Sequence, residues 1–361
     1  MRALASVVSA PEVPSTGRTL EMGRRPQRKD RNKVGSASPT SYRHLLLHLL
    51  ALVLAVLFLA SLQGGVLALT PSHLWEKLYT TLGLDGRMLP AQTRQAAEEL
   101  FKVGYTVLAK PLPSALVAKA AASTQTRLAR LLAAVEMHEG CSATETTYSM
   151  RELMHRGYKR WDVRVQGIEP WWPEHEELVK HVLKLVNPVL NELQPMYRRP
   201  VVEPRLDQSG VVVSRPGAVI QDAHADGERH VRPGQIIALF VPLVDIERDG
   251  DGTEFWNGSH IRDQNGRPQG GRSPAERLRP ALAAGSIILY DFKTVHKGLA
   301  NPAGGRERPL LYLTIAADLS AHDENNFPSE LPSAYDGAAA SACMPIDQFK
   351  DNRPYTQWAV P

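Results

Sequence analysis

Gln221-Asp-Ala-His224-Ala-Asp226 gives the first indication of the fold and chemistry of the second half of this chain. In an extended strand, side chains two residues apart point to the same face. His224 and Asp226 would therefore direct an imidazole and a carboxylate at one point. The bare triplet also fits a surface histidine beside a solvated aspartate, so a third ligand has to come from elsewhere.

The segment Gly285-Ser-Ile-Ile-Leu-Tyr-Asp-Phe-Lys-Thr-Val-His296-Lys-Gly298 supplies it. An apolar strand ends, and His296 follows just before a glycine. Two histidines and one carboxylate on one metal, with coordination positions left open, form the facial triad of non-haem Fe(II) oxygenases. We therefore predict His224, Asp226 and His296 as iron ligands and catalytic residues. The alternative for His296 is a core or capping histidine.

Such a site needs an anchor for the far carboxylate of a 2-oxo acid. Arg308 lies 12 residues after His296, at the start of an apolar strand. Its guanidinium can grip a carboxylate through two parallel hydrogen bonds. Arg306 has the same strand parity and stays open as the competitor. His260, in the glycine-rich segment 249–260, is predicted to be a turn residue and not a ligand.

Periodicity divides the chain further. Apolar residues at helical spacing predict helices at Ala96–Lys102, Ser114–Val135 and Glu174–Leu193, so residues 70–200 read as mostly helical, with a short strand at 104–108. After Pro200, short apolar runs between turns predict strands, listed here in order: Val211–Ser214, Ile236–Val244, Ser286–Tyr290 and Leu310–Ala316. Helices first and strands later indicate an α+β fold with an antiparallel double-sheet barrel.

The joint pattern resembles the phytanoyl-CoA dioxygenase-like family over roughly residues 95–330. The resemblance rests on Pro216-Gly-Ala-Val-Ile-Gln221-x-x-His224-x-Asp226, on 240–245, on Gly252-Thr-Glu-Phe-x-x-Gly-Ser-His260, and on 291–301 with 308–312 and 325–327. It implies a double-stranded β-helix core (jelly-roll, cupin-like) with flanking helices. It also implies Fe(II), 2-oxoglutarate as co-substrate and O2, with ascorbate as a candidate reductant.

By the same resemblance, the chain would hydroxylate a small-molecule or lipid-like substrate while 2-oxoglutarate is decarboxylated to succinate and CO2. The carboxylate at 226 favours hydroxylation, because related halogenating scaffolds have a small residue there. Two alternatives stay open: a luminal peptidyl hydroxylase, and a catalytically silent binding or scaffold protein. The family does not fix the substrate or the oligomeric state.

The N-terminal region has a different character. Residues 1–43 carry nine Lys/Arg and three Asp/Glu, a charge of +6, so with +4 overall the remainder is −2. This balance argues against nucleic-acid binding by the folded part. Residues 1–43 lack periodicity and read as a disordered tail.

Residues 45–69 contain no Asp, Glu, Lys or Arg and are long enough to cross a bilayer. We predict a transmembrane signal anchor at 44–69, with a cytosolic N-terminus and a luminal catalytic domain in the endoplasmic reticulum or Golgi. A buried core helix, a cleaved secretory signal and a plastid signal are the alternatives. Residues 70–94 would form a helical linker, 95–330 the dioxygenase domain and 331–361 a C-terminal extension. Cys141 and Cys343 are expected to be two unlinked thiols, although an oxidising compartment would let them pair.

Overall fold

The computed structural model describes residue 88 and residues 90–345, except 89, 110–111, 156, 166–171, 200–202, 227–230, 248–251, 264–266, 318–320, 323–330 and 338–342. The tail and the apolar stretch at 45–69 lie outside the described residues, so the membrane anchor stays a prediction. In the part of the chain that is described, no helix combines the length and apolarity needed to span a bilayer.

Three α-helices form where the periodicity predicts them: α3 (Pro90–Val103), α4 (Ser114–Glu136) and α5 (Pro173–Met196). α5 begins with a proline at its first position and has Glu174 and Glu176 in its first turn. A proline is tolerated there because the amide it lacks has no partner inside the helix, and acids favour the positive end of the helix dipole. Its buried residues recur every three or four positions, so one stripe faces the core.

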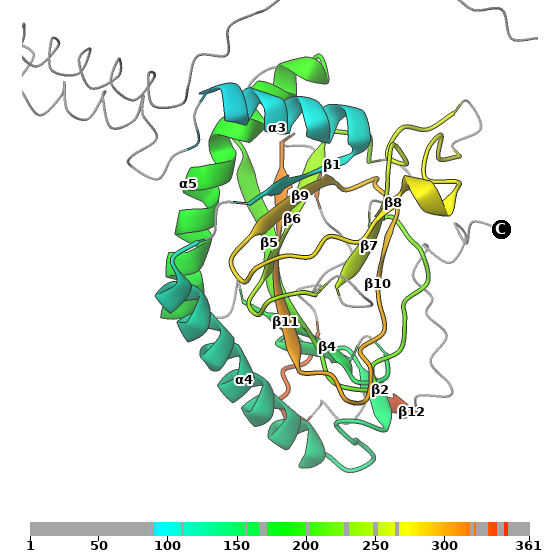
Figure 1. Ribbon diagram of the computed structural model, residues 1–361. Helices are drawn as coiled ribbons and strands as arrows, with labels where there is room; N and C mark the ends of the chain where they lie inside the picture. The colour runs from blue at the N-terminus through cyan, green and yellow to red at the C-terminus, as the bar shows by residue number, and fades with distance from the viewer. Residues whose placement is uncertain are drawn as a thin grey trace, which may run out of the picture. The chain divides into compact units, whose positions relative to one another are not determined.

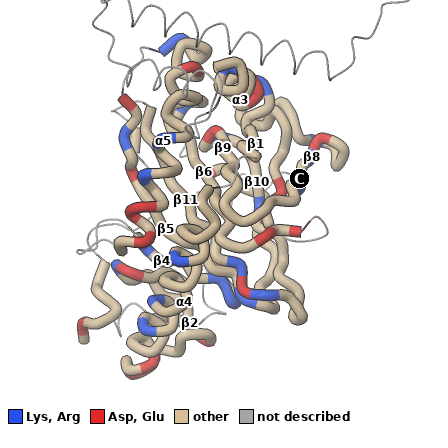
Figure 2. The backbone as a smooth tube through the Cα atoms, turned by 60° about the vertical axis from the view of Figure 1, so that its left-hand side comes forward, with Lys and Arg blue, Asp and Glu red and all other residues tan. Residues whose placement is uncertain are grey.

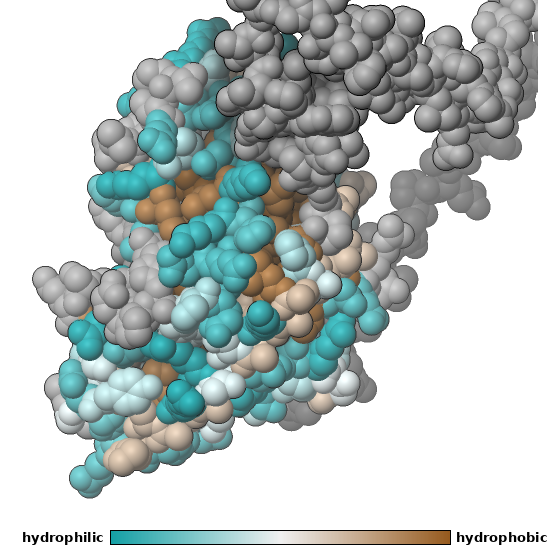
Figure 3. Space-filling model, turned by 90° about the vertical axis from the view of Figure 1, so that its left-hand side faces the viewer, coloured by the Kyte–Doolittle hydropathy of each residue, from teal (hydrophilic) through white to brown (hydrophobic). Residues whose placement is uncertain are grey.

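A seven-stranded antiparallel sheet carries the fold, in the order β1-β9-β6-β11-β5-β4-β3. Its strands are β1 (Tyr105–Leu108), β3 (Leu153–His155), β4 (Arg160–Arg164), β5 (Arg205–Ser214), β6 (Ile236–Pro242), β9 (Ile287–Asp291) and β11 (Arg308–Ala316). Figure 1 shows α4 and α5 along one side of this sheet. The view onto that side shows mostly hydrophilic residues, with hydrophobic ones in limited patches (Figure 3).

A smaller sheet, β10-β7-β8, is built from β7 (Thr253–Trp256), β8 (Arg277–Leu278) and β10 (His296–Gly298). The two faces of β6 contribute to two different apolar clusters. Ile237, Leu239 and Val241 belong to the large cluster that includes the helices. Ile236 and Ala238 belong to a second cluster with Phe255 of β7. Two sheets with an apolar interior between them confirm the predicted α+β, jelly-roll-like core.

The prediction that 70–200 is mostly helical is wrong for 146–164. This segment holds β2 (Thr146–Tyr148), β3 and β4, of which β4 pairs with β5 in the large sheet. These strands have three to five residues, and strands so short carry little periodic signal. Elsewhere the predicted strands differ from the observed ones mainly at their ends.

The expectation of two unlinked cysteines is also wrong. Cys141 and Cys343 form a disulfide between residues 202 positions apart in the sequence. The disulfide fastens β12 (Cys343–Pro345), which pairs with β2, to the segment that follows α4. Ser333 and Ala334 of the same C-terminal segment donate hydrogen bonds to the buried carboxylate of Glu152. The C-terminal segment is thus attached to the domain covalently and by hydrogen bonds.

Charged residues of both signs are interspersed along the backbone in the view of Figure 2, rather than separated by sign.

Candidate active site and metal centre

Backbone pairing brings the two distant histidines together. The amide of His224 donates to the carbonyl of His296 at 2.9 Å, and the amide of His296 donates back at 2.8 Å. This isolated antiparallel bridge places residues that are 72 positions apart directly opposite each other. Their rings therefore lie 4.7 Å apart between centroids.

Asp226 completes the cluster two residues after His224, although the segment forms an isolated bridge followed by a bend and not the extended strand that was expected. One of its carboxylate oxygens is 3.7 Å from Nε2 of His224, and the other is 3.5 Å from Nε2 of His296. One ligand atom from each of the three residues lies within 4.8 Å of the others, and no other cluster of this kind is found among the described residues. The structure thus confirms that the three predicted residues converge.

The histidines are oriented for metal binding through Nε2. Nδ1 of His224 lies 2.7 Å from the carbonyl of Asp222, and Nδ1 of His296 lies 3.1 Å from the carbonyl of Thr294. Because a carbonyl only accepts, each Nδ1 carries the proton in these bonds. Nε2 of each ring can then act as the metal ligand, because the partner at Nδ1 fixes the tautomer.

Asp226 is held by a tyrosine that the sequence reasoning did not single out. The hydroxyl of Tyr290 donates to Asp226 Oδ2 at 2.8 Å. Its ring stands 5.0 Å from that of His296 and 4.8 Å from that of Phe240. Phe255 packs against His296 from another side at 5.8 Å. Tyr290 and Phe255 therefore pack against His296, and Tyr290 also holds Asp226, which restricts the rotation of both ligands.

These residues fit a divalent iron. Neighbouring ligand atoms of an octahedral ion with bonds of about 2.1 Å lie about 3 Å apart. The observed separations from the Asp226 oxygens exceed this value by less than 1 Å, so small side-chain movements close the site. Imidazole nitrogens and one carboxylate on one face are the donor set that non-haem Fe(II) takes.

The triad opens into a cavity, here called the metal cavity, of about 720 Å³ including its mouth. Besides the three ligands it is lined by Arg160, Asp162, Val212, Gln221, Phe240, Thr253, Tyr290, Phe292, Gly298, Leu310, Tyr312 and Thr314. Gly298 is needed at its rim, because a Cβ there would lie 2.3 Å from Gln221 Oε1 and 2.6 Å from a guanidinium nitrogen of Arg160. The glycine after His296 therefore lets two polar side chains reach the cavity.

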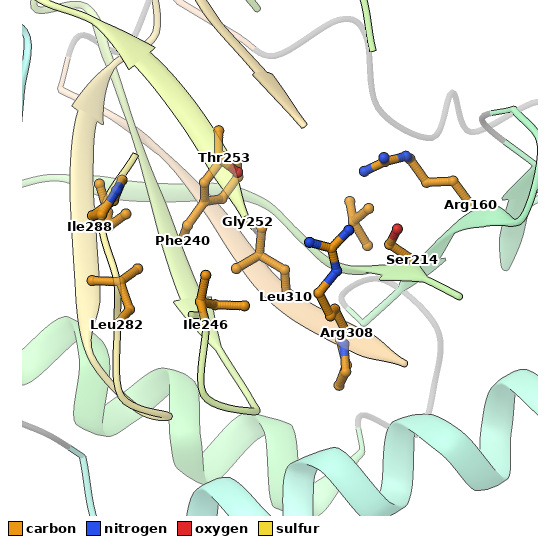
Figure 4. Close-up of a pocket in the computed structure, with 13 residues that line it drawn as sticks. Arg160, Ser214, Phe240, Ile246, Gly252, Thr253, Leu282, Ile288, Arg308 and Leu310 are labelled. Carbon is orange, nitrogen blue, oxygen red and sulfur yellow. The ribbon is translucent and has the colours of Figure 1, made fainter. Parts of the chain in front are cut away.

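A second cavity of about 520 Å³, the arginine chamber, adjoins the first, since Arg160, Val212, Phe240, Thr253 and Leu310 line both. Arg308 lines only this chamber, whose other walls are mostly apolar. Figure 4 shows the guanidinium groups of Arg160 and Arg308 reaching toward the same space from β4 and β11. Both side chains are buried, at 6% and 5% exposure. Burial, together with repulsion from Arg308, lowers the pKa of Arg160 to about 10.

The structure separates the two candidate arginines. Arg306 is exposed and donates to the carbonyl of Asp245, before β11 begins. Arg308 is buried in β11, opposite Ser214 of β5. The prediction for His260 is confirmed: it lies in a turn outside the metal cluster, and its Nε2 is 3.0 Å from the carbonyl of Phe101.

Arg160 is the main site residue that sequence reasoning missed. The only signal was a period-two alternation in Arg160-Trp-Asp-Val-Arg164. Trp161 and Val163 join the core, and Arg160 and Asp162 line the cavities. That pattern was hidden because the surrounding region read as helical.

An antiparallel double-sheet barrel that brings two histidines and a carboxylate together defines a non-haem iron oxygenase. The model of the phytanoyl-CoA dioxygenase (PhyH) family matches residues 102–308, more than half of the chain, and the protein belongs to this family. It is therefore an iron- and 2-oxoglutarate-dependent dioxygenase with His224, Asp226 and His296 as its facial triad.

Solved structures with a similar fold include the epimerase SnoN from nogalamycin biosynthesis, with 21% identity, coverage of 63% of this chain and 84% of that chain, and a TM-score of 0.44. AviO1 from Streptomyces viridochromogenes Tue57 has 20% identity, coverage of 63% and 95%, and a TM-score of 0.43. A prolyl-4-hydroxylase from Pseudomonas putida has 14% identity, coverage of 62% and 98%, and a TM-score of 0.40.

Proposed function

We propose that this protein hydroxylates a small-molecule or lipid-like substrate, and that Arg308, assisted by Arg160, binds the distal carboxylate of 2-oxoglutarate. The observation that carries the proposal is the arginine chamber beside the triad. Two buried cations that repel each other favour an anion between them, and the apolar walls suit the methylene groups of the oxo acid. Arg160 and Arg308 also donate to a backbone carbonyl, that of Leu299, but both are buried and line the chamber. Arg306 is exposed and lines neither cavity.

Each residue then has a defined task. His224 and His296 hold iron through Nε2, Asp226 holds it through its carboxylate, and Tyr290 keeps that carboxylate in place. Arg308 and Arg160 orient the co-substrate by its distal end, and Val212, Phe240 and Leu310 keep water away from its chain. Iron with 2-oxoglutarate supplies O2 activation, by which a substrate C–H bond is hydroxylated while succinate and CO2 are formed.

The full-length chain in detergent tests the co-substrate site. Anaerobic Fe(II) with 2-oxoglutarate should give a visible charge-transfer band, and His296→Ala should abolish it. Arg308→Met should raise the 2-oxoglutarate concentration at half-saturation by about 10- to 100-fold, because it removes charge-assisted hydrogen bonds worth about 1.5–3 kcal/mol. Arg306→Met, the matched control, should leave it unchanged. Equal effects of the two arginine variants would overturn the assignment of Arg308.

We also infer that the catalytic domain works in an oxidising compartment, on the luminal side of a membrane. The disulfide between Cys141 and Cys343 supports this inference, since such bonds persist in secretory compartments and are rare in the cytosol. The basic tail followed by the apolar stretch at 45–69 supports it independently.

Thiol alkylation of cells expressing the full chain tests the compartment. Both cysteines should resist alkylation until a reductant is added, and protease added to intact microsomes should remove only the N-terminal tail. Cysteines that are alkylated without reductant would contradict the luminal location.

A further inference from the structure

The inner face of β4 carries a buried acid that the chemistry described above does not use. Asp162 lies between Arg160 and Arg164 on the face opposite Trp161 and Val163. It lines the metal cavity together with the three iron ligands, yet only 3% of its surface is exposed. A carboxylate in such a place offers hydrogen-bond acceptors to whatever enters the cavity.

β11, which β5 separates from β4 in the sheet, supplies a side chain that contacts this acid. The hydroxyl of Tyr312 donates to Asp162 Oδ2 at 3.4 Å. Its ring lies over Gly210 of β5, where a Cβ would approach the Tyr312 hydroxyl to 2.6 Å. The absent side chain at 210 therefore lets the tyrosine reach across β5 to β4. Thr314, two residues further along β11, adds another hydroxyl to the same wall.

The two cavities differ in what they can bind. The arginine chamber presents cations and apolar walls, which suits an anion with a short methylene chain. The metal cavity shares Arg160 with the chamber but adds Asp162, Tyr312 and Thr314, which suit a molecule with hydrogen-bond donors. With Arg160 engaged by 2-oxoglutarate as proposed above, a substrate carboxylate would be repelled by Asp162, and a bare hydrocarbon chain would offer that buried carboxylate no hydrogen-bond donor.

We propose that Asp162, positioned by Tyr312, is the specificity-determining residue of this active site and binds a hydroxyl or ammonium group of the substrate. This inference rests on the proposed function and narrows it. The substrate carries a hydrogen-bond donor that is held beside the carbon to be oxidised, and simple fatty-acyl chains are excluded.

Three probes of equal length test the inference: hexylammonium, hexanol and hexanoate. With Mn(II) in place of iron and 2-oxoglutarate present, the paramagnetic relaxation of their protons reports both binding and approach to the metal. Hexylammonium or hexanol should bind at least about 10-fold more tightly than hexanoate, with the polar end near the metal. Tighter binding of hexylammonium would indicate an ammonium group in the substrate, and tighter binding of hexanol would indicate a hydroxyl group.

Variants show whether Asp162 is the cause. Asp162→Asn, which keeps the shape, should reduce the affinity for the preferred probe by about 10-fold, and Tyr312→Phe should weaken it less. Asp336→Asn, at an exposed position, is the control. Equal binding of all three probes, no binding of any, or a preference indifferent to Asp162→Asn would overturn the proposal. The charge-transfer band of the unmodified chain reports iron and 2-oxoglutarate separately, so failure here is distinguishable from failure of the proposed function.

Discussion

Both faces of the seven-stranded sheet are largely buried, but only the inner face carries the cavity-lining polar residues of β4 and β11 among its apolar ones. On the outer face, Leu311, Leu313 and Ile315 of β11 have no exposed surface and pack in the cluster that includes the helices. On the inner face, Arg308 and Tyr312 of the same strand are 5% exposed and line the cavities. Burial therefore does not tell the stabilising face from the functional one. The buried polar residues at alternate positions of β4 and β11 mark the functional face, and changes on the two faces should have separable effects.

The largest effect on the inner face is expected from Asp226→Ala. Removing the only carboxylate of the triad should abolish succinate formation and iron retention, measured by coupled turnover and by metal analysis. Stability should change little, by about 1 kcal/mol, because the main loss is one hydrogen bond from Tyr290. Asp336→Ala, at an exposed position, should change neither. Turnover surviving in Asp226→Ala would show that the triad is not the metal site.

The outer face should behave in the opposite way. Leu313→Ala removes a fully buried side chain of β11, and the cavity left behind should lower the free energy of unfolding by about 4 kcal/mol. Denaturant unfolding measures this loss, and the turnover of the folded fraction should stay near that of the parent. Leu278→Ala, at a residue that is 37% exposed, is the control with a small expected loss. A fall in iron affinity larger than the fall in stability would mean that the faces are coupled.

Most of the elements that build the two faces could be predicted from the sequence. The apolar run at 236–244 predicted β6, and helical spacing predicted α4 and α5, because these signals are local and strong. The histidine–aspartate triplet was weak alone and predicted the ligands only together with His296. β4 escaped because it has five residues, three of them charged, within a region dominated by helices. Its charged residues could be read as inner-face residues only after pairing with β5 was known.

Long-range contacts could not be predicted for another reason. The disulfide joins residues 202 positions apart, and nothing near Cys141 or Cys343 in the sequence indicates that β12 pairs with β2. The bond from Tyr290 to Asp226 likewise depends on how β9 lies beside the triad. Such contacts follow from the complete fold rather than from local pattern.

Removing the disulfide is a change that touches neither face of the seven-stranded sheet. Replacing Cys141 and Cys343 together by serine should lower the free energy of unfolding by about 3 kcal/mol, mainly because the unfolded chain regains conformational freedom. Iron and 2-oxoglutarate binding should persist, since neither cysteine lines the metal cavity or the arginine chamber. The parent protein in a reductant should match the double variant. If reductant leaves the unfolding midpoint of the parent protein unchanged, the disulfide does not form.

The smallest and most specific effect is expected for Tyr290→Phe. Phenylalanine keeps the ring contacts with His296 and Phe240, so the free energy of unfolding should change by about 1 kcal/mol or less. Asp226 loses the donor that holds one of its oxygens, and loss of such an outer partner weakens metal binding by about 10-fold or more. Tyr105→Phe is the matched control, because Tyr105 packs on the same Phe255 but donates to Asn257 instead of a ligand. Iron titration of both variants separates the hydrogen bond to Asp226 from the loss of a buried hydroxyl elsewhere in the same aromatic cluster. Equal losses in the two would assign the effect to the cluster as a whole and remove Tyr290 from the positioning of the triad.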